Sequence, residues 1–299
     1  MKKLSLLFFA IILLSGCALY EQDSYQENYV VESYLVAGDE LPKVRLSTTS
    51  PISKKYKFED NTVSNANVEV RRLTPDSSVA ETYAYLEQES GIYKPQNSIT
   101  VQDHQLYGLH ITTDKGDEIT ATTFVPGNFK TVNELQEEYM YQGSQQIEVI
   151  TTPSQYLTNR QAYYIFTVNA VNPDTASLTP FYMDQVLNGD SEIEDFYINS
   201  SGIINEKNYD RNENNNIQLT VPWLAIAFYD TNNVVANAID NNMYDFLRSQ
   251  DVQTGGSTLS PGEIQNINYN ISGGIGIFGS MASDTNQVVI SKPDQSNGS

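Results

Sequence analysis

The stretch LYGLHITTDKGDEITATTFV, residues 106–125, decides the fold. Its two arms, 106–113 and 118–125, are rich in β-branched and aromatic residues, and the turn residues Asp114-Lys115-Gly116-Asp117 separate them. Two such runs joined by a short glycine-containing loop are typical of a β-hairpin. The stretch therefore predicts two antiparallel strands, and its neighbours decide how the sheet continues.

Short segments of the same kind continue upstream as far as residue 29. They alternate or are β-branched and end at turn residues, and they span 29–36, 44–48, 66–73 and 81–86. About seven short strands in about 100 residues are typical of an immunoglobulin-like β-sandwich. The Cys…Trp…Cys core of true immunoglobulins is absent, so the likeness is one of architecture. We predict a sandwich over 29–126, closed by Pro126-Gly127-Asn128.

For residues 127–290 the sequence predicts a larger, mostly-β domain with one amphipathic helix. The whole chain is therefore predicted to be mainly β. Its strand candidates are 146–151, 160–171, 193–198, 217–229, a glycine-rich strand over 271–280, and 287–290. Residues 233–249 lack Gly and Pro, and their apolar positions Val235, Ile239, Met243, Phe246 and Leu247 recur at three- and four-residue steps. This spacing predicts the helix.

Three less regular segments complete the second part. Residues 131–143 predict a short helix, and the Asn-rich residues 205–216 predict a long exposed loop. We expect the tail, 291–299, to be disordered.

The first 17 residues have the parts of an export signal. Lys2 and Lys3 precede an apolar run over 4–14, which is shorter than the roughly 20 residues of a membrane-spanning helix. Leu14-Ser15-Gly16-Cys17 resembles the lipobox of bacterial lipoproteins, which implies that the Cys17 sulfur receives a diacylglycerol. We predict a signal peptide over 1–16, lipid attachment at Cys17 and a lipidated tether over 17–28. The alternative is an ordinary secretory signal that contains a cysteine.

The charge of the chain limits its partners. The full chain has a formal charge of −20, and removal of residues 1–16 removes two lysines, which leaves 15 basic against 37 acidic residues, or −22. Such a surface repels the phosphate backbone of nucleic acid, so we expect no nucleic-acid partner. Anionic lipid head groups repel it too, so we expect only the acyl chains to hold the protein at a membrane. The acidity serves solubility, or alternatively a cationic or metal partner.

No motif predicts a catalytic, cofactor or metal site. Gly273-Gly274-Ile275-Gly276 lacks the Lys-Ser/Thr of a phosphate loop and is expected to allow close strand packing. Asp210-Arg211-Asn212-Glu213-Asn214 begins like a calcium loop, but Val221 stands where the bidentate Glu belongs. His104 and His110 are the only histidines, and no usual zinc site follows from two histidines without carboxylates. The 37 acidic residues allow many carboxylate pairs, and their spacing selects none.

A series of motifs resembles, in order, the Bacteroidetes outer-membrane lipoproteins grouped as domain-of-unknown-function family 4249. They are Val30-Val31-Glu32-Ser33-Tyr34-Leu35, Val44-Arg45-Leu46-Ser47, Ala66-Asn67-Val68-Glu69-Val70, Gly91-Ile92-Tyr93, Tyr244-Asp245-Phe246-Leu247-Arg248 and 270–279. The Asn-rich stretch near 210 departs from the family, where a tighter turn is expected. The resemblance implies the cell outer membrane, names no activity, and suggests a TonB-dependent transporter as partner. Asp174-Thr175-Ala176 also resembles a short O-glycosylation motif, which would modify Thr175.

Three functions remain open at this point. The first is a non-enzymatic, lipid-anchored lipoprotein that serves as an accessory of a TonB-dependent uptake system, with 233–249 and 273–279 as contact surface or core. The second is a surface glycan-binding or glycan-degrading protein that stacks sugars on tyrosines and Trp223, although Trp223 has apolar neighbours typical of a core. The third is a structural envelope lipoprotein. Glu21 and Asp23 after Cys17 are typical of surface-exposed lipoproteins, but they do not decide between the periplasmic and the surface face.

Overall fold

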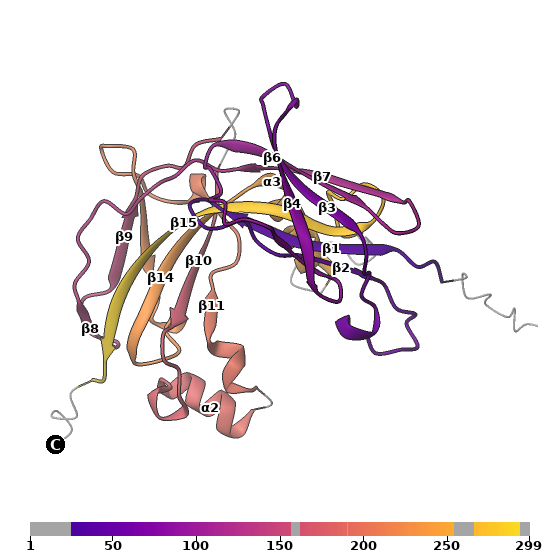
Figure 1. Ribbon diagram of the computed structural model, residues 1–299. Helices are drawn as coiled ribbons and strands as arrows, with labels where there is room; N and C mark the ends of the chain where they lie inside the picture. The colour runs from indigo at the N-terminus through magenta and orange to yellow at the C-terminus, as the bar shows by residue number, and fades with distance from the viewer. Residues whose placement is uncertain (1–24, 157–161, 190, 254–265, 294–299) are drawn as a thin grey trace, which may run out of the picture.

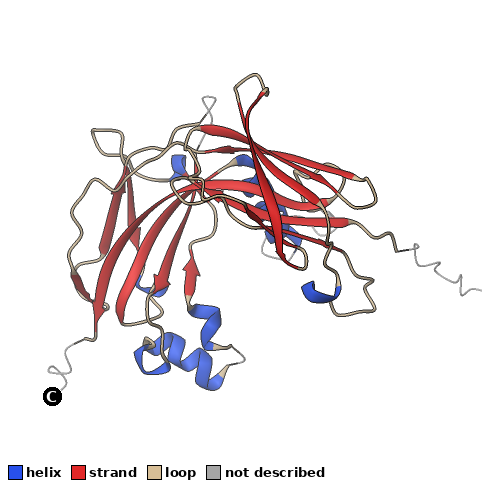
Figure 2. Ribbon diagram, in the orientation of Figure 1, coloured by secondary structure: helices blue, strands red, loops and turns tan. Residues whose placement is uncertain are grey.

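The computed structural model describes residues 25–156, 162–189, 191–253 and 266–293. The chain is mainly β, as predicted (Figure 2). The strands are β1 Tyr29–Val36, β2 Val44–Thr48, β3 Asn67–Leu73, β4 Val79–Glu89, β5 Ile92–Pro95, β6 Gln105–Thr112, β7 Glu118–Val125, β8 Glu138–Met140, β9 Ile147–Thr151, β10 Tyr163–Ala170, β11 Ile198–Ser200, β12 Ile204–Asn205, β13 Ile217–Val221, β14 Asp230–Ile239 and β15 Ile275–Ser291. The helices are α2 Pro180–Asn188 and α3 Asn241–Gln253, with short 3₁₀ turns such as η1 Phe58–Asp60 and η5 Trp223–Ala225.

One sheet connects most of the molecule. Its strands follow the order β11-β10-β14-β15-β1-β2-β5-β4-β3-β6-β7, while β12 and β8 pair at its sides. The strands β9 and β13 form a separate two-stranded sheet. Because β11 pairs on one side only among the described strands, it is an open edge of the large sheet.

The last strand, β15, holds the two parts of this sheet together (Figure 1). Its first half runs parallel to β1, from the pair Val30 and Ile275 to the pair Val36 and Met281. Its second half runs antiparallel to β14. The strand β15 thus belongs to both parts of the sheet. The domain boundary predicted near residue 126 stays a prediction.

The first part encloses an apolar core between β1 and β2 on one side and β3, β6 and β7 on the other. Alternate residues of each strand point inward, as in Val68 and Val70 of β3 and Leu109 and Ile111 of β6, which are all buried. This is the period of two that a half-buried strand requires. The predicted hairpin is confirmed, because β6 and β7 pair from Gln105 and Val125 to Thr112 and Glu118. The immunoglobulin-like arrangement stays a prediction.

The helix predicted over 233–249 is wrong in its first half. Residues up to Ile239 belong to β14, and α3 begins only at Asn241. Val234, Ala236 and Ala238 face one side of the sheet and are buried. Their spacing of two is typical of a strand, and the same stretch of sequence also contains the helical spacing. The segment is a strand because β-branched residues lie beside these positions and because it pairs with β10 on one side and β15 on the other.

Other elements of the second part also differ from the prediction. The segment 131–143 contains β8 and no helix, and 193–198 is largely the 3₁₀ turn Ile193–Phe196. Residues 217–229 end their strand at Val221, because Pro222 has no backbone N–H to continue it and caps η5. The second helix, α2, was not predicted. Residues 294–299 of the expected disordered tail lie outside the description, while Ser291 ends β15.

Glycines allow β15 to approach its neighbours closely. Gly276 has a φ of +112°, and a Cβ there would lie 2.0 Å from the Val31 carbonyl oxygen. Gly273, at φ +82°, would place a Cβ 2.2 Å from the Glu118 oxygen. The packing role predicted for Gly273-Gly274-Ile275-Gly276 is therefore confirmed.

We expect Gly276→Ala to lower the free energy of unfolding by more than about 3 kcal/mol, because it adds a backbone clash to the roughly 1–2 kcal/mol of a left-handed backbone. Gly38→Ala is the matched control. Gly38 has a φ of +86° with open space around it, so only the backbone cost applies. Urea denaturation of both variants measures the difference, and equal losses would contradict the close-approach explanation.

Candidate functional site

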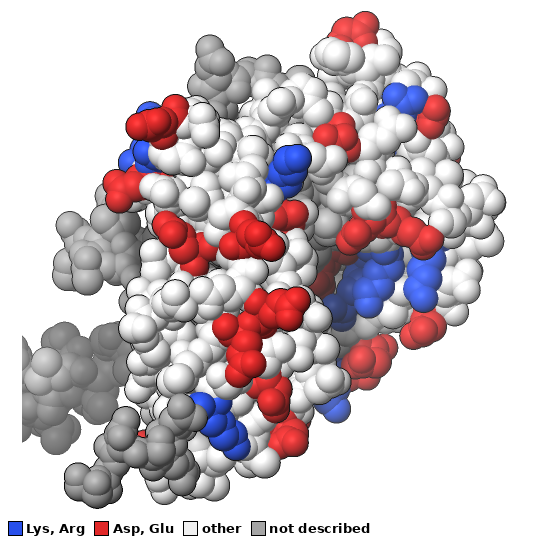
Figure 3. All heavy atoms as spheres, turned by 90° about the vertical axis from the view of Figure 1, so that its left-hand side faces the viewer, with Lys and Arg blue, Asp and Glu red and all other residues white. Residues whose placement is uncertain are grey.

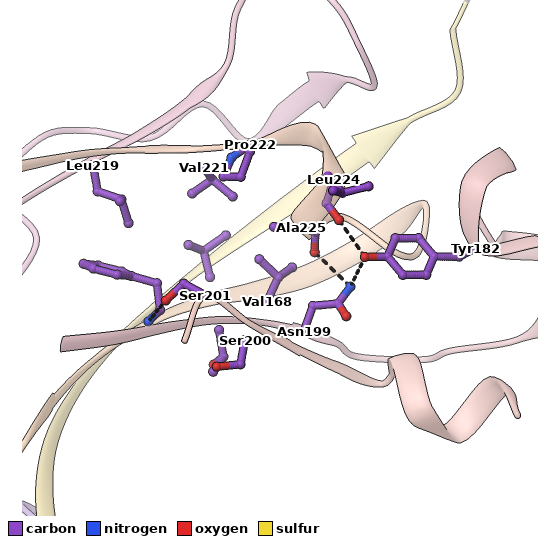
Figure 4. A pocket seen from close by; sticks show the side chains of 13 residues that line it. Val168, Tyr182, Asn199, Ser200, Ser201, Leu219, Val221, Pro222, Leu224 and Ala225 are labelled. Carbon is purple, nitrogen blue, oxygen red and sulfur yellow. Dashed lines mark hydrogen bonds between the residues drawn. The ribbon is translucent and has the colours of Figure 1, made fainter. Parts of the chain in front are cut away.

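A pocket of about 270 Å³ lies beside the open edge of the large sheet (Figure 4). Its floor comes from β10 and β14 and its opposite wall from β13 and η5, while β11 and α2 close one end. The lining residues are Phe166, Thr167, Val168, Tyr182, Asn199, Ser200, Ser201, Leu219, Val221, Pro222, Leu224, Ala225 and Val234. The volume is slightly below that of a typical small-molecule site, and it suits one large apolar group.

The apolar lining follows from strand alternation. Phe166 and Val168 of β10 point to the same side of the sheet and are buried. Leu219 and Val221 alternate in the same way on β13, which lies across from them. Two sheets thus present apolar faces to each other, and the gap between them is the pocket.

A small polar network closes the end of the pocket next to α2. The Tyr182 hydroxyl donates to the Leu224 carbonyl oxygen at 2.6 Å, and Asn199 Nδ2 donates to the same hydroxyl oxygen at 3.1 Å. Asn199 Nδ2 also donates to the Ala225 carbonyl oxygen at 3.2 Å. Burial raises the pKa of Tyr182, so the phenol is neutral and acts as a donor.

The rim of the pocket is apolar. The side chain of Leu224 lines the pocket and remains 59% exposed. Phe181, whose ring packs edge-on against Tyr182 at 5.0 Å, is also exposed. A partner that covers this rim would remove apolar surface from water, which favours association.

Most of the described lining of the pocket is apolar. It includes no carboxylate, histidine, lysine or cysteine, and its polar side chains are hydroxyls and the Asn199 amide. Sequence reasoning missed this site because its walls come from segments far apart in the chain. Pro180 after Thr179, a typical helix start, was the signal that could have placed α2 and Tyr182.

The calcium-like stretch folds as a tight turn. Asn212 Oδ1 accepts hydrogen bonds from the backbone N–H groups of Asn214 and Asn216, both at 3.0 Å. Asn215 takes a φ of +62°, and Arg211 bridges to Ile217. The predicted loop over 205–216 is confirmed, because the segment between β12 and β13 is mostly irregular and exposed, with local order only from the 3₁₀ turn Glu206–Asn208 and this turn. Among the described residues, no group of three His, Cys, Asp or Glu side chains could hold a metal ion.

The remaining predicted residues lie apart from the pocket or outside the description. Leu14, Ser15, Gly16 and Cys17 are outside the described residues. His104 packs edge-on against Phe124 at 5.3 Å, and His110 lies on β6 opposite Glu69 and Thr120. Thr175 is exposed at the start of a 3₁₀ turn that Asp174 caps, and its glycosylation stays a prediction.

Trp223 packs partly buried against the core of the second part, with its ring 5.6 Å from that of Tyr141. Its expected place in the core is confirmed.

One buried carboxyl stands out by its surroundings. Asp240, at the junction of β14 and α3, accepts from the Thr123 hydroxyl at 2.6 Å and from the Met243 backbone N–H at 2.9 Å. Burial raises the pKa of Asp240 to about 6, although these donors lower it. Thr123 also lies 2.8 Å from the Ser280 hydroxyl, which donates to the Phe124 carbonyl oxygen. When Asp240 is ionised, the Thr123 hydroxyl donates to its carboxylate and the Ser280 hydroxyl donates to the Phe124 carbonyl oxygen, so no hydrogen is left for the contact between the two hydroxyls. When Asp240 is protonated, the carboxyl hydrogen bonds to Thr123, and the Thr123 hydroxyl can then donate to Ser280.

A raised pKa is often a sign of a functional site. Asp240, however, lines neither the pocket described above nor any other cavity described here. It joins β7, α3 and β15 instead, so we assign it a structural role.

A family model matches residues 19–287 of this chain, under the description domain of unknown function (DUF4249). The chain belongs to this family, as its motifs predicted. No curated protein matches it. No helix among the described residues has the length and apolar character needed to cross a membrane.

Solved structures show only remote similarity. Escherichia coli alpha-2-macroglobulin activated by porcine elastase is 10% identical, with 89% of this chain and 23% of that chain covered and a TM-score of 0.25. The trypsin-activated form is 8% identical, with 72% and 14% covered and a TM-score of 0.20. Three N-terminal domains of the bacteriophage RB49 outer capsid protein Hoc are 7% identical, with 90% and 71% covered and a TM-score of 0.21. The chain spans less than a quarter of the macroglobulins, and scores this low carry no argument.

We expect the stability of the protein to fall as the pH rises through about 6, because Asp240 must then ionise in a buried site. The folded state holds this proton more tightly than the unfolded state, so the contribution is complete below about 4 and is lost above about 6. Its size is on the order of 3 kcal/mol at most. Asp240→Asn, whose amide can donate to Thr123, should lose this pH dependence in denaturant titrations between pH 4 and 8.

The control for this experiment is Asp245→Asn, which changes an exposed side chain on the same helix. It should keep the pH profile of the natural protein. If Asp240→Asn retained that profile as well, the assignment of the raised pKa to Asp240 would be wrong.

Proposed function

We propose that the protein is a non-enzymatic, lipid-anchored lipoprotein of the cell outer membrane that binds a partner through the pocket at the sheet edge. The observation that carries the proposal is the pocket itself, because its described lining is mostly apolar and includes no carboxylate, histidine, lysine or cysteine. Leu14-Ser15-Gly16-Cys17 supports the anchor, since the motif has the order of a lipobox.

The partner we propose is a TonB-dependent transporter, with this chain as an accessory of nutrient uptake. The pocket supports a protein partner in two ways. Its volume suits one large side chain, and the neighbouring strand β11 has an unpaired edge that an extended segment can join. The exposed rim residues Phe181 and Leu224 would be covered in such a complex.

The alternative of glycan binding has less support. Trp223, the lone tryptophan, is partly buried and packs against the core of the second part, with its ring edge-on to that of Tyr141. The described lining of the pocket is mostly aliphatic, whereas sugar sites need many hydrogen-bonding groups.

Affinity purification of the lipidated protein from native outer membranes in mild detergent tests the proposal. We expect a TonB-dependent barrel to co-purify in stoichiometric amount. Leu224→Asp should reduce its recovery at least tenfold, since it places a charge at the centre of the apolar contact. The Leu224 side chain is largely exposed, so the variant should fold normally.

Val79→Asp is the control, because Val79 is an exposed apolar residue of similar accessibility on β4, which lies in the first part, seven positions from β11 in the sheet order. It should leave recovery unchanged. Intact protein purified alone, in high yield, would rule out a stable transporter complex.

A further inference from the structure

The loop that follows β2, residues 50–57, carries the most exposed large apolar side chain among the described residues. Ile52 is 91% exposed. It occupies the tip of a turn in which the Lys54 backbone N–H donates to the Pro51 carbonyl oxygen at 2.9 Å. Tyr56, four residues later, is also exposed. An exposed isoleucine at a turn tip contributes nothing to the core of this protein.

The same loop carries a local positive charge in an acidic chain. Lys54, Lys55 and Lys57 lie on it, and all three are exposed. Among the described residues they form no ion pair. Residues 41–58 contain five Lys or Arg and no acidic residue, although Glu59 and Asp60 follow directly. The formal charge of −20 therefore gives no guide to this surface.

Side-chain contacts with β2 hold the loop in place. The Arg45 guanidinium lies 4.2 Å from the centre of the Phe58 ring, and the Tyr56 and Ser47 hydroxyls are 3.0 Å apart. A cavity of about 500 Å³ separates these loop residues from β1 and β2. These contacts fix the C-terminal end of the loop, and the Ser50 hydroxyl, which donates to Asn61 Oδ1 at 2.8 Å, fixes its start, so its tip projects in a defined direction.

The start of the described chain lies at the base of this loop. The Thr49 backbone N–H donates to the Asn28 carbonyl oxygen at 2.9 Å, and the Tyr25 and Thr49 hydroxyls are 2.8 Å apart. Figure 1 shows β1 beginning beside the indigo loop after β2. Cys17 is eight residues before Tyr25, so the extended chain between them reaches at most about 28 Å. An anchor at Cys17 would keep this loop near the membrane surface.

We propose that residues 50–57 are a membrane-contact loop that binds the anionic phosphate head groups of the leaflet holding the anchor. Lys54, Lys55 and Lys57 contact the head groups, and Ile52 enters the interface between them. The inference rests on the proposed lipid anchor at Cys17. Figure 3 shows acidic side chains over the opposite side of the molecule. The loop explains how a protein with such a surface can contact an anionic membrane with one end only.

Lysine modification in vesicles tests the proposal on the full chain. The lipidated protein is reconstituted into vesicles of phosphatidylethanolamine with 30% phosphatidylglycerol, or of phosphatidylcholine alone, and treated with a water-soluble acetylating reagent. Peptide mass spectrometry then gives the acetylation rate of each lysine. We expect Lys54, Lys55 and Lys57 to react at least about fivefold more slowly in the anionic vesicles, as a single head-group contact would require. Lys130 and Lys207, exposed in the second part, are internal controls that should react equally in both.

Two variants separate the apolar contact from charge alone. Ile52→Asp should abolish the protection of the three lysines. Leu187→Asp changes a side chain that is 67% exposed on α2 and should leave the protection intact. High salt should also remove the protection, because it screens the lysines from the head groups.

The same samples distinguish the loop from the anchor. Acyl groups on Cys17 together with protected lysines support both proposals. Acyl groups on Cys17 with equal lysine rates in both vesicles overturn the loop and leave the anchor. Protected lysines on a chain without acyl groups support the loop and overturn the anchor, and a chain with neither overturns both.

Discussion

The structure depends on the close approach of β15 to β1. Gly276 lies so near the Val31 carbonyl oxygen that no side chain fits between them, and this contact begins the pairing of the two strands. From there β15 supplies residues to three apolar clusters: Phe278 to that of the first part, and Ala282 and Val288 to two of those in the second part. A single strand therefore couples parts of the chain that would otherwise pack separately. The stability of β15 therefore depends on elements that lie more than 200 residues apart in the sequence.

The sequence predicted local pairing well, because local pairing has local signals. Gly116 and the alternating arms around it were enough to place β6 and β7, and Gly273 and Gly276 were enough to indicate close packing. It failed where two periods coexist. Val235, Ile239 and Met243 recur at helical steps, but burial on both faces of the sheet and pairing with β10 and β15 made the first half a strand.

The site could not be predicted, because its residues are joined only by the fold. Tyr182, Asn199 and Leu224 come from a helix, an edge strand and a 3₁₀ turn, and no motif links them. The Asn-rich stretch is a smaller case. Its composition predicted the polar loop, but it did not predict that Asn212 uses its side-chain oxygen to close a turn within that loop. The charge of the chain shows the same limit, because a total of −20 conceals the basic segment after β2.

The pocket and the basic loop give the molecule two different ends. The pocket lies by β11 and α2, in the left half of Figure 1, and the loop after β2 lies in the right half. The continuous sheet connects them, so a partner bound at one end would be held at a fixed distance from a membrane at the other.

Hydrogen exchange of the β15 amides, followed by mass spectrometry, tests most directly whether the chain forms one body around this strand. The account predicts that the amides paired with β1 and those paired with β14 exchange equally slowly, through the same global unfolding. It also predicts that mild denaturant releases both together. Rapid exchange in one half while the other stays protected would contradict it, because the two parts would then open independently.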